Sequence, residues 1–285
     1  MNITRSRQLE LLALLFVLVV LGAACRTQDE VLLATTTSVH DAGLLDELLP
    51  RFEARTGYRV KPLVVGSGQA LALAARGEVD VVITHSPQDE RRLLEEGVVV
   101  ERHLVMYNHF VLLGPPEDPA GVRGLSDPRE AFRRIAAAGA IFLSRGDSSG
   151  THVKEMELWK AAGVSPAGAW YQESGTGMGE TLRIASEKGA YTLADWGTFL
   201  ALRHQLRLEP FVRGGSMLVN PYHVMAVNGA RFSRVNAEGA AALVQFLLSE
   251  QAQAVIARFG TRQYGEPLFI PAAGLTEEEL SGGGR

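Results

Sequence analysis

Small hydroxyl residues and glycines gather at four places where an apolar, strand-like run gives way to a helical pattern. These segments are residues 34–41, 65–69, 143–152 and 173–180. The first backbone N–H groups of a helix have no partner within the helix, and the helix dipole favours negative charge there. Gly lets the backbone approach a ligand closely, and Ser or Thr adds a short O–H donor. The chemistry that such residues can perform is therefore the binding of an oxyanion.

Arg145 lies inside the third segment and adds a permanent charge with a planar fork of donors. Any one segment is weak evidence, because Ser, Thr and Gly cap helices in many proteins. In open parallel sheets, however, ligands sit beyond the carboxyl ends of the strands, where all four segments are expected. Three histidines in or beside the segments can add donors, although a lone histidine more often packs or caps: His40, His85 and His152. We therefore expect the segments to converge on one anion site.

Alternating strands and helices must position these segments. Apolar runs predict strands at residues 31–35, 58–65, 79–83, 98–113, 140–143, 190–193 and 217–227. Helical patterns predict helices at residues 44–52, 69–76, 87–96, 129–138, 151–162, 181–187, 196–204 and, as one long amphipathic helix, 237–259. Ser38 and Asp41 have the spacing of a capping box, so a helix is expected to begin there. The alternation predicts parallel sheets covered by helices on both faces.

The composition excludes several classes of protein. Of the 285 residues, 46% are hydrophobic and 21% are charged, which indicates a globular chain of roughly two domains and not a disordered one. The single Cys excludes a disulfide framework and a thiolate metal cluster, and no His-Glu-x-x-His, dinucleotide or P-loop fingerprint is present. Neither a metal nor a cofactor is therefore expected. The net charge of −4 argues against nucleic-acid binding but not against a small anion, which local donors and dipoles can hold.

The N-terminus has the pattern of a secretory signal. Residues 1–7 carry two Arg and no acid, and an apolar run follows at residues 11–24. This run is too short for a comfortable membrane span, which needs about 20 residues. Cys25 stands where a bacterial lipoprotein signal places its lipidated residue, although Gly22 departs from the usual lipobox. Simple cleavage just before the Cys is the alternative, and either outcome places the mature protein outside the cytoplasmic membrane.

Five segments, in this order, resemble the tungstate-binding lipoproteins of bacterial ABC importers. They read Thr-Thr-Thr-Ser at 35–38, Val-Gly-Ser-Gly at 65–68, Arg-Gly-Asp-Ser-Ser-Gly-Thr-His at 145–152, Leu-Ala-Asp-Trp-Gly-Thr at 193–198 and Asn-Pro-Tyr at 220–222. The resemblance covers about residues 31–270. The spacing Arg-x-x-x-Ser-Gly-Thr is also similar to that of phosphate-binding proteins of the same fold.

The resemblance implies a set of ligand contacts and no catalytic residue. The implied contacts are Thr36, Thr37, Ser38, Ser67, Arg145, Ser149, Gly150 and Thr151. We add Thr176 and Gly177 on their chemistry alone, because they lie in the fourth donor-rich segment. The ligand would be tungstate or molybdate, and the partner that receives it would be the ABC transporter permease.

The resemblance also implies an α/β fold of the periplasmic-binding-protein type II class. Such a fold has two lobes of parallel or mixed sheets flanked by helices, with the ligand in the cleft between them. Its implied organisation is a lipoprotein-type signal at 1–25, a discontinuous lobe I at 31–113 and 214–275, lobe II at 114–213 and a flexible tail at 276–285. Lipid on Cys25 would anchor the protein to the outer face of the membrane.

Two alternatives remain open on the sequence. Tungstate, molybdate and sulfate carry no proton near neutral pH and need only donors, whereas monohydrogen phosphate benefits from one acceptor. The loops hold Asp41, Asp147 and Glu173, so a phosphate- or sulfate-binding protein of the same fold is one alternative. Tungstate and molybdate have nearly the same size and charge, and the preference for tungstate depends on the resemblance.

The second alternative is a secreted serine hydrolase. Residues 146–150 fit the Gly-x-Ser-x-Gly nucleophile elbow, with Ser148 as the nucleophile. Asp195 followed by His204 or His223 would supply the chain order of a triad. Arg145 and the other three donor-rich segments have no role in a simple esterase, which favours the binding protein.

Overall fold

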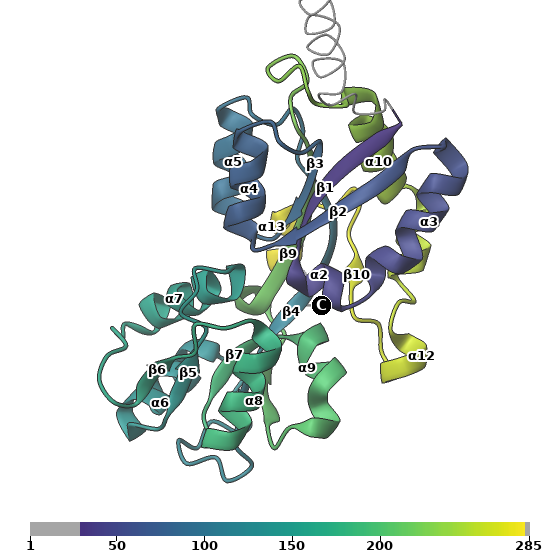
Figure 1. Ribbon diagram of the computed structural model, residues 1–285. Helices are drawn as coiled ribbons and strands as arrows, with labels where there is room; N and C mark the ends of the chain where they lie inside the picture. The colour runs from purple at the N-terminus through teal and green to yellow at the C-terminus, as the bar shows by residue number, and fades with distance from the viewer. Residues whose placement is uncertain (1–28, 283–285) are drawn as a thin grey trace, which may run out of the picture.

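Two lobes joined by two long strands make up the computed structural model, which describes residues 29–282 (Figure 1). The joining strands are β4 (His103–Gly114) and β9 (Val219–Ala226), which we call the crossing strands. In lobe I, β4 pairs with β9 over residues 103–109, and in lobe II it pairs with β7 and β8 over residues 110–114. The passage between the lobes thus falls within continuous strands, slightly before the boundary at 113 that the sequence predicted.

Lobe I is a mixed sheet covered on both faces. Its strand order is β10 (Ile270–Pro271), β4, β9, β3 (Val81–Thr84), β1 (Glu30–Thr36) and β2 (Arg59–Val65). β1 runs parallel to β2 and β3, whereas β9 runs antiparallel to β3 and β4. The predicted α/β class is therefore confirmed, but the sheet is mixed and not all-parallel as the alternation suggested.

Helices cover lobe I according to the period-2 alternation of β1. Val31 and Leu33 are buried in a cluster with Phe52 of α3 (Leu44–Thr56) and Leu243 of α10 (Ala237–Leu248). Ala34 points to the other face, where it packs in a cluster with residues of α4 (Ser67–Ala75). α5 (Pro87–Glu95) lies beside α4 on that face (Figure 1).

Lobe II is smaller and has an aromatic core. β7 (Thr192–Asp195) and β8 (Glu209–Arg213) pair with β4, and β5 (Phe142–Ser144) runs parallel to β6 (Tyr171–Glu173). Its helices are α6 (Pro128–Ala138), α7 (Gly150–Ala162), α8 (Met178–Lys188) and α9 (Trp196–Leu202). The fully buried Trp159 packs edge-on against Phe132 and Phe142, with ring centroids 4.4 and 5.0 Å away.

The single long helix predicted for residues 237–259 is wrong. α10 ends at Leu248, and α11 (Glu250–Ile256) begins after Ser249, whose backbone is extended at ψ 153°. The hydroxyl of Ser249 accepts from the backbone N–H of Ala252 at 3.4 Å and so caps the new helix. In the described part of the chain, no single helix is long and apolar enough to cross a membrane, and the segments around this break satisfy that test only as a pair bent by 58°.

Residues 277–282 also differ from the flexible tail expected at 276–285. Glu277–Gly282 form the short helix α13, which contacts β9 and the turn before it. The carboxylate of Glu277 pairs with Arg91 at 3.0 Å and also with Arg102. The acidic, Gly-rich composition is typical of a tail, but these ion pairs come from residues far away in the sequence and hold the segment against the crossing strands.

His223 lies at the centre of this ionic cluster. Its Nδ1 is 3.0 Å from Glu90, and its Nε2 is 3.3 Å from Glu277. Burial by itself would lower the pKa of His223, but hydrogen bonds to Glu277 and Glu90 outweigh burial and raise it above the ordinary value of 6.5. The hydrogen bond from His223, together with the hydrogen bond and charge of Arg102, holds the pKa of Glu277 far below its ordinary range.

We expect His223→Gln to remove part of the pH dependence of stability. A histidine pKa that is raised by folding contributes stability fully below about pH 6.5, and this contribution is lost as the pH rises through the folded-state pKa. The wild-type melting temperature should therefore fall relative to that of His223→Gln between pH 6 and pH 9. Thermal unfolding of both proteins across this range checks the sign, and parallel curves would contradict it.

Candidate functional site

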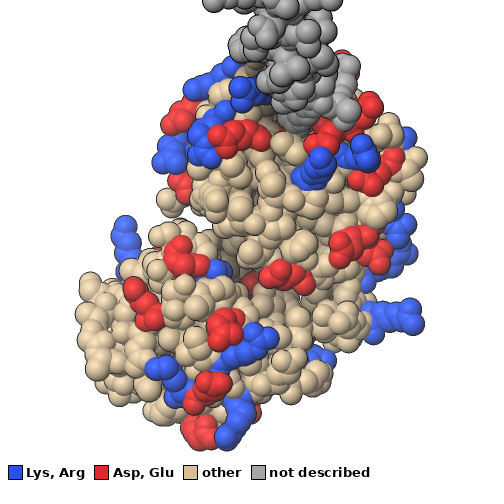
Figure 2. Space-filling view, viewed as in Figure 1, with Lys and Arg blue, Asp and Glu red and all other residues tan. Residues whose placement is uncertain are grey.

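A cavity of about 470 Å³ lies between the two lobes. The space-filling view shows the surface hollowed where the lobes meet, with charges of both signs scattered over each lobe (Figure 2). The predicted ligand residues that line the cavity are Thr36, Thr37, Ser38, Ser67, Arg145, Ser149, Gly150, Thr151 and Gly177. The structure therefore brings together segments that are separated by more than a hundred residues in the chain.

Lobe I supplies the starts of two helices. Thr36 ends β1 and is the N-cap of α2 (Thr37–Asp41), so this helix begins at Thr37 and not at Ser38 as the capping-box spacing suggested. No side chain caps α2 or α4, which begins at Ser67. The buried hydroxyl of Ser67 has no hydrogen-bond partner among the described residues. Both helix starts thus leave donors that a ligand in the cavity can use.

Lobe II supplies a guanidinium that is held in place. The Arg145 side chain is 11% exposed, and its Nη2 lies 2.5 Å from the carboxylate of Asp147. Its Nε donates to the backbone carbonyl of Thr176 at 3.4 Å. Burial lowers the pKa of Arg145 from its very high ordinary value, and the charge of Asp147 opposes this shift, so the side chain stays protonated.

The loop before α7 is ordered by its own side chains. Asp147 Oδ1 accepts from the backbone N–H of Ser149 at 3.1 Å, and Ser149 Oγ accepts from the N–H of His152 at 3.4 Å. Ser149 is therefore the N-cap of α7, which places Gly150 and Thr151 in its first turn. Ser148 has a left-handed backbone at φ 57°, which the turn into the helix requires.

Thr176 is the predicted contact that does not line the cavity. Its carbonyl accepts from Arg145, and its hydroxyl lies 3.3 Å from that of Thr181 in α8. The segment faces the cavity at Gly177 instead, which is the N-cap of α8 and offers no side-chain cap. The structure thus gives Thr176 a role in holding Arg145.

His85 and Asp195 also line the cavity. The sequence suggested His85 only as an additional donor, and Asp195 only as a member of the alternative hydrolase triad. A Cβ on Gly150 would lie 2.4 Å from His85 Cε1, so lobe II packs its helix start directly against this ring of lobe I. Asp195 is the N-cap of α9 and provides a fifth helix start at the site. The signal for Asp195 was present in the sequence, because a lone acid between a buried strand and an apolar helix is typical of an N-cap.

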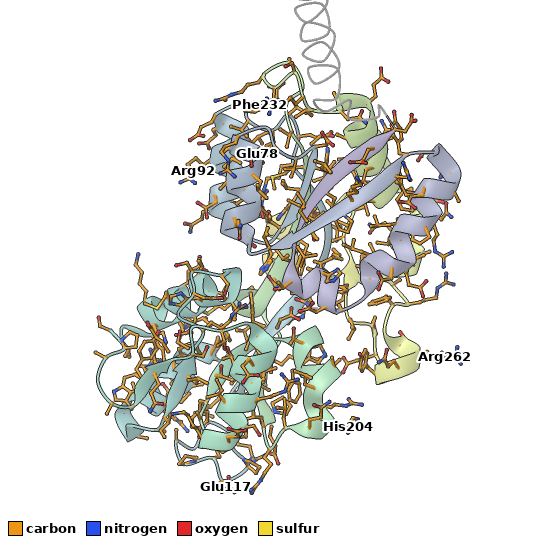
Figure 3. The ribbon with its side chains drawn as sticks, in the orientation of Figure 1. Glu78, Arg92, Glu117, His204, Phe232 and Arg262 are labelled. Atoms are coloured by element: carbon orange, nitrogen blue, oxygen red, sulfur yellow. The ribbon has the colours of Figure 1, made fainter. Side chains whose placement is uncertain are left out.

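The hydrolase triad is not assembled. Ser148 donates its backbone N–H to His152, and Asp195 accepts from Asn108, Tyr222 and other donors. His204 lies on the outer edge of lobe II (Figure 3), and His223 belongs to the ionic cluster with Glu90. Among the described residues, no group of three or more His, Cys, Asp or Glu side chains is placed to hold a metal.

Carboxylates outnumber cations around the cavity. Arg145 is the one Lys or Arg among the described lining residues, against Asp41, Asp147, Glu180 and Asp195. An anion in this cavity must therefore be held by nearby N–H dipoles, hydroxyls and the single guanidinium, because the total charge does not attract it. The arrangement suits a small anion that fits among fixed donors.

Comparisons with known proteins agree with this geometry. A family model described as a PBP superfamily domain matches residues 22–251. The chain belongs to the PBP superfamily, a class of two-lobed binding proteins. Within it, the chain is 43% identical over 250 residues to the tungstate-binding protein TupA of Peptoclostridium acidaminophilum, covering 87% of each chain. It is thereby a member of the family that contains the TupA proteins.

Solved structures show the same fold. This chain is similar to the crystal structure of the tungstate ABC transporter from Geobacter sulfurreducens, with 42% sequence identity and a TM-score of 0.75. The match covers 81% of this chain and 99% of the Geobacter chain. The tungstate binding protein TupA from Desulfovibrio alaskensis G20 is 37% identical, with a TM-score of 0.76, over 86% of this chain and 99% of that chain.

We expect Gly150→Ala to destabilise the closed arrangement of the lobes. The added methyl would lie 2.4 and 2.6 Å from two atoms of the His85 ring, and such overpacking costs about 1–3 kcal/mol. At roughly 2–4 °C per kcal/mol, the melting temperature should fall by about 2–12 °C. Gly177→Ala is the control, because its Cβ would meet nothing within 4 Å. Equal melting temperatures for the two variants would contradict the contact.

Proposed function

We propose that this protein is an extracytoplasmic solute-binding protein that captures tungstate for an ABC importer. The observation that carries the proposal is the convergence of helix starts from both lobes, together with Arg145, on one cavity. The relatives named for tungstate binding support the identity of the anion. The protein then has no catalytic step, and its partners are the oxyanion and the transporter permease.

The proposed ligand contacts come from both lobes. They are Thr36, Thr37, Ser38 and Ser67 from lobe I, and Arg145, Ser149, Gly150, Thr151 and Gly177 from lobe II. Backbone N–H groups at the uncapped starts of α2, α4 and α8 would complete the donor set. Because the anion would touch both lobes only when they are together, it shifts the equilibrium toward the closed state.

A fully ionised dianion suits this cavity better than monohydrogen phosphate. Phosphate needs an acceptor for its proton. Of the four lining carboxylates, Asp147 and Asp195 already accept hydrogen bonds from protein donors and Glu180 accepts from Arg183, which leaves only Asp41 for this role among the described lining residues. Tungstate and molybdate need donors only, as does sulfate. A phosphate- or sulfate-binding protein remains the second candidate. The thermal-shift panel described next distinguishes it from a tungstate-binding protein.

A thermal-shift panel tests the proposal. Tungstate at about 100 times its dissociation constant adds roughly 2.7 kcal/mol of stability, which should raise the melting temperature by about 5–10 °C. Molybdate should produce a similar shift, sulfate a smaller one because it is a smaller dianion, and phosphate at the same concentration little or none. A shift with phosphate or sulfate alone would replace the proposed ligand, and no shift with any of the four anions would overturn the function.

Arg145→Ala should weaken tungstate binding by about 30-fold or more, because it leaves buried oxyanion charge without its cation. Arg145→Lys should also lose affinity, since a point charge does not replace a planar fork. Arg129→Ala is a matched control: Arg129 pairs with Asp127 two residues away, as Arg145 does with Asp147, but it is exposed and away from the cavity. Calorimetric titration that gives wild-type affinity for Arg145→Ala would remove this residue from the site.

The lipid anchor remains part of the proposal, because Cys25 and the signal at 1–25 lie outside the described residues. Lipid on Cys25 would hold the protein at the outer face of the membrane, close to the permease. In a bacterial host, wild-type protein should partition with the membrane fraction, and Cys25→Ser should move to the soluble extracytoplasmic fraction. Equal partitioning of the two proteins, together with a mass spectrum that shows a mature N-terminus without lipid, would indicate simple cleavage.

A further inference from the structure

Asp195 has a buried carboxylate at the cavity, but it is not one of the proposed ligand contacts. It ends β7 in lobe II, is 4% exposed and lines the cavity. An unshielded carboxylate would repel a bound dianion strongly in such a site. Its position at an anion cavity therefore calls for a function other than contact with the ligand.

Five donor contacts shield this carboxylate. Oδ2 accepts from Asn108 Nδ2 at 2.6 Å, from the Tyr222 hydroxyl at 3.2 Å and from Asn220 Nδ2 at 3.3 Å. Oδ1 accepts from the backbone N–H of Thr198 at 3.0 Å and from its hydroxyl at 3.4 Å, which caps α9. The negative charge is thus offset by protein donors before any ligand enters.

These donors lie where the two lobes are joined. Asn108 and Asn220 face each other as a register pair of the crossing strands, two residues before β4 begins to pair with β7. Both side chains are almost fully buried, and Asn220 Nδ2 donates to Asn108 Oδ1 at 2.9 Å. Asp195 of lobe II is therefore bonded directly to the two strands about which the lobes must turn.

Tyr222 extends the network into lobe I. Its hydroxyl donates to Oδ2 of Asp195, and its oxygen accepts from Asn220 at 2.9 Å. Burial, and then the charge of Asp195, raise the pKa of Tyr222 well above its ordinary value and keep the hydroxyl protonated. The same oxygen lies 3.3 Å from Ser38 Oγ, which in turn is 3.0 Å from Thr36 Oγ1.

We propose that Asp195 is a positioning residue that couples anion capture to closure of the lobes. Through the crossing strands and Tyr222, it ties the start of α9 in lobe II to the hydroxyls of Thr36 and Ser38 in lobe I. Those hydroxyls are held in their positions at the cavity only when the Asp195 network is complete. The inference depends on the proposed function, because it concerns the same anion site.

Two variants test the coupling. Asp195→Asn keeps the shape but turns an amide donor toward Asn108 and Tyr222, and Tyr222→Phe removes the link to Ser38 while keeping the ring. Asp118→Asn and Tyr191→Phe are matched controls, because Tyr191 donates to Asp118 at 2.6 Å in a comparable pair that does not line the cavity. For each protein we would measure the tungstate affinity, its dissociation rate and the change in scattering radius on binding.

The positioning role predicts weaker binding. Asp195→Asn should reduce tungstate affinity by about 10- to 100-fold and Tyr222→Phe by about 3- to 10-fold, mainly through faster dissociation. The double variant should lose less than the product of the two factors, because the residues share one network. Both variants should also show a smaller compaction on binding than wild type, and the two controls should bind and compact as wild type does.

An increase in the tungstate affinity of Asp195→Asn would overturn the inference. If Asp195 acts only as a negative charge near the ligand, Asp195→Asn removes repulsion and binds tungstate more tightly. Unchanged affinity with normal compaction would overturn it equally. If Asp195→Asn fails to fold, Tyr222→Phe decides by the same measurements. The proposed function is tested separately by the wild-type protein, which must bind the oxyanion for either result to count.

Discussion

One electrostatic constraint governs the proposed site: an anion would have to be held in a cavity where, among the described lining residues, carboxylates outnumber the single arginine. Net charge does not attract it there, so binding requires short-range donors whose positions are fixed in advance. Helix starts meet this requirement because their first N–H groups are aligned by the helix itself. The loops can then remain short, and the sheet only has to bring the ends of its strands to one place.

The crossing strands make that convergence possible. β4 pairs within both lobes and β9 lies beside its lobe I half, so the cavity lies close to the point where the pairing of β4 changes from β9 to β7. His85 against Gly150 and the network around Asp195 both bridge the lobes beside the cavity. The buried amide nitrogens of Asn108 and Asn220 both donate to Asp195, and Asn220 also donates to Asn108 Oδ1, whereas Asn220 Oδ1 has no hydrogen-bond partner among the described residues.

Local patterns predicted most of the residues that line the cavity, and they failed where contacts between distant residues determine the structure. The donor-rich segments and Arg145 could be found because Gly, Ser and Thr after a strand indicate a helix start wherever they occur. Gly177 lines the cavity and Thr176 does not, a difference that the composition of the segment does not show. The break at Ser249 and the docking of Glu277 were missed because a cap within an apolar pattern, and ion pairs with residues far along the chain, leave no periodic signal.

The sequence by itself determined the class of fold, the kind of chemistry and the order of the donor-rich segments, because these follow from local residue types and periodicity. Tertiary structure decided that the segments share one cavity, that the sheet is mixed, and that Asp195 and His85 lie beside the proposed ligand residues. The physical reason is that strand order and direction are set by packing and pairing between distant segments. Only that packing turns separate helix starts into a single site.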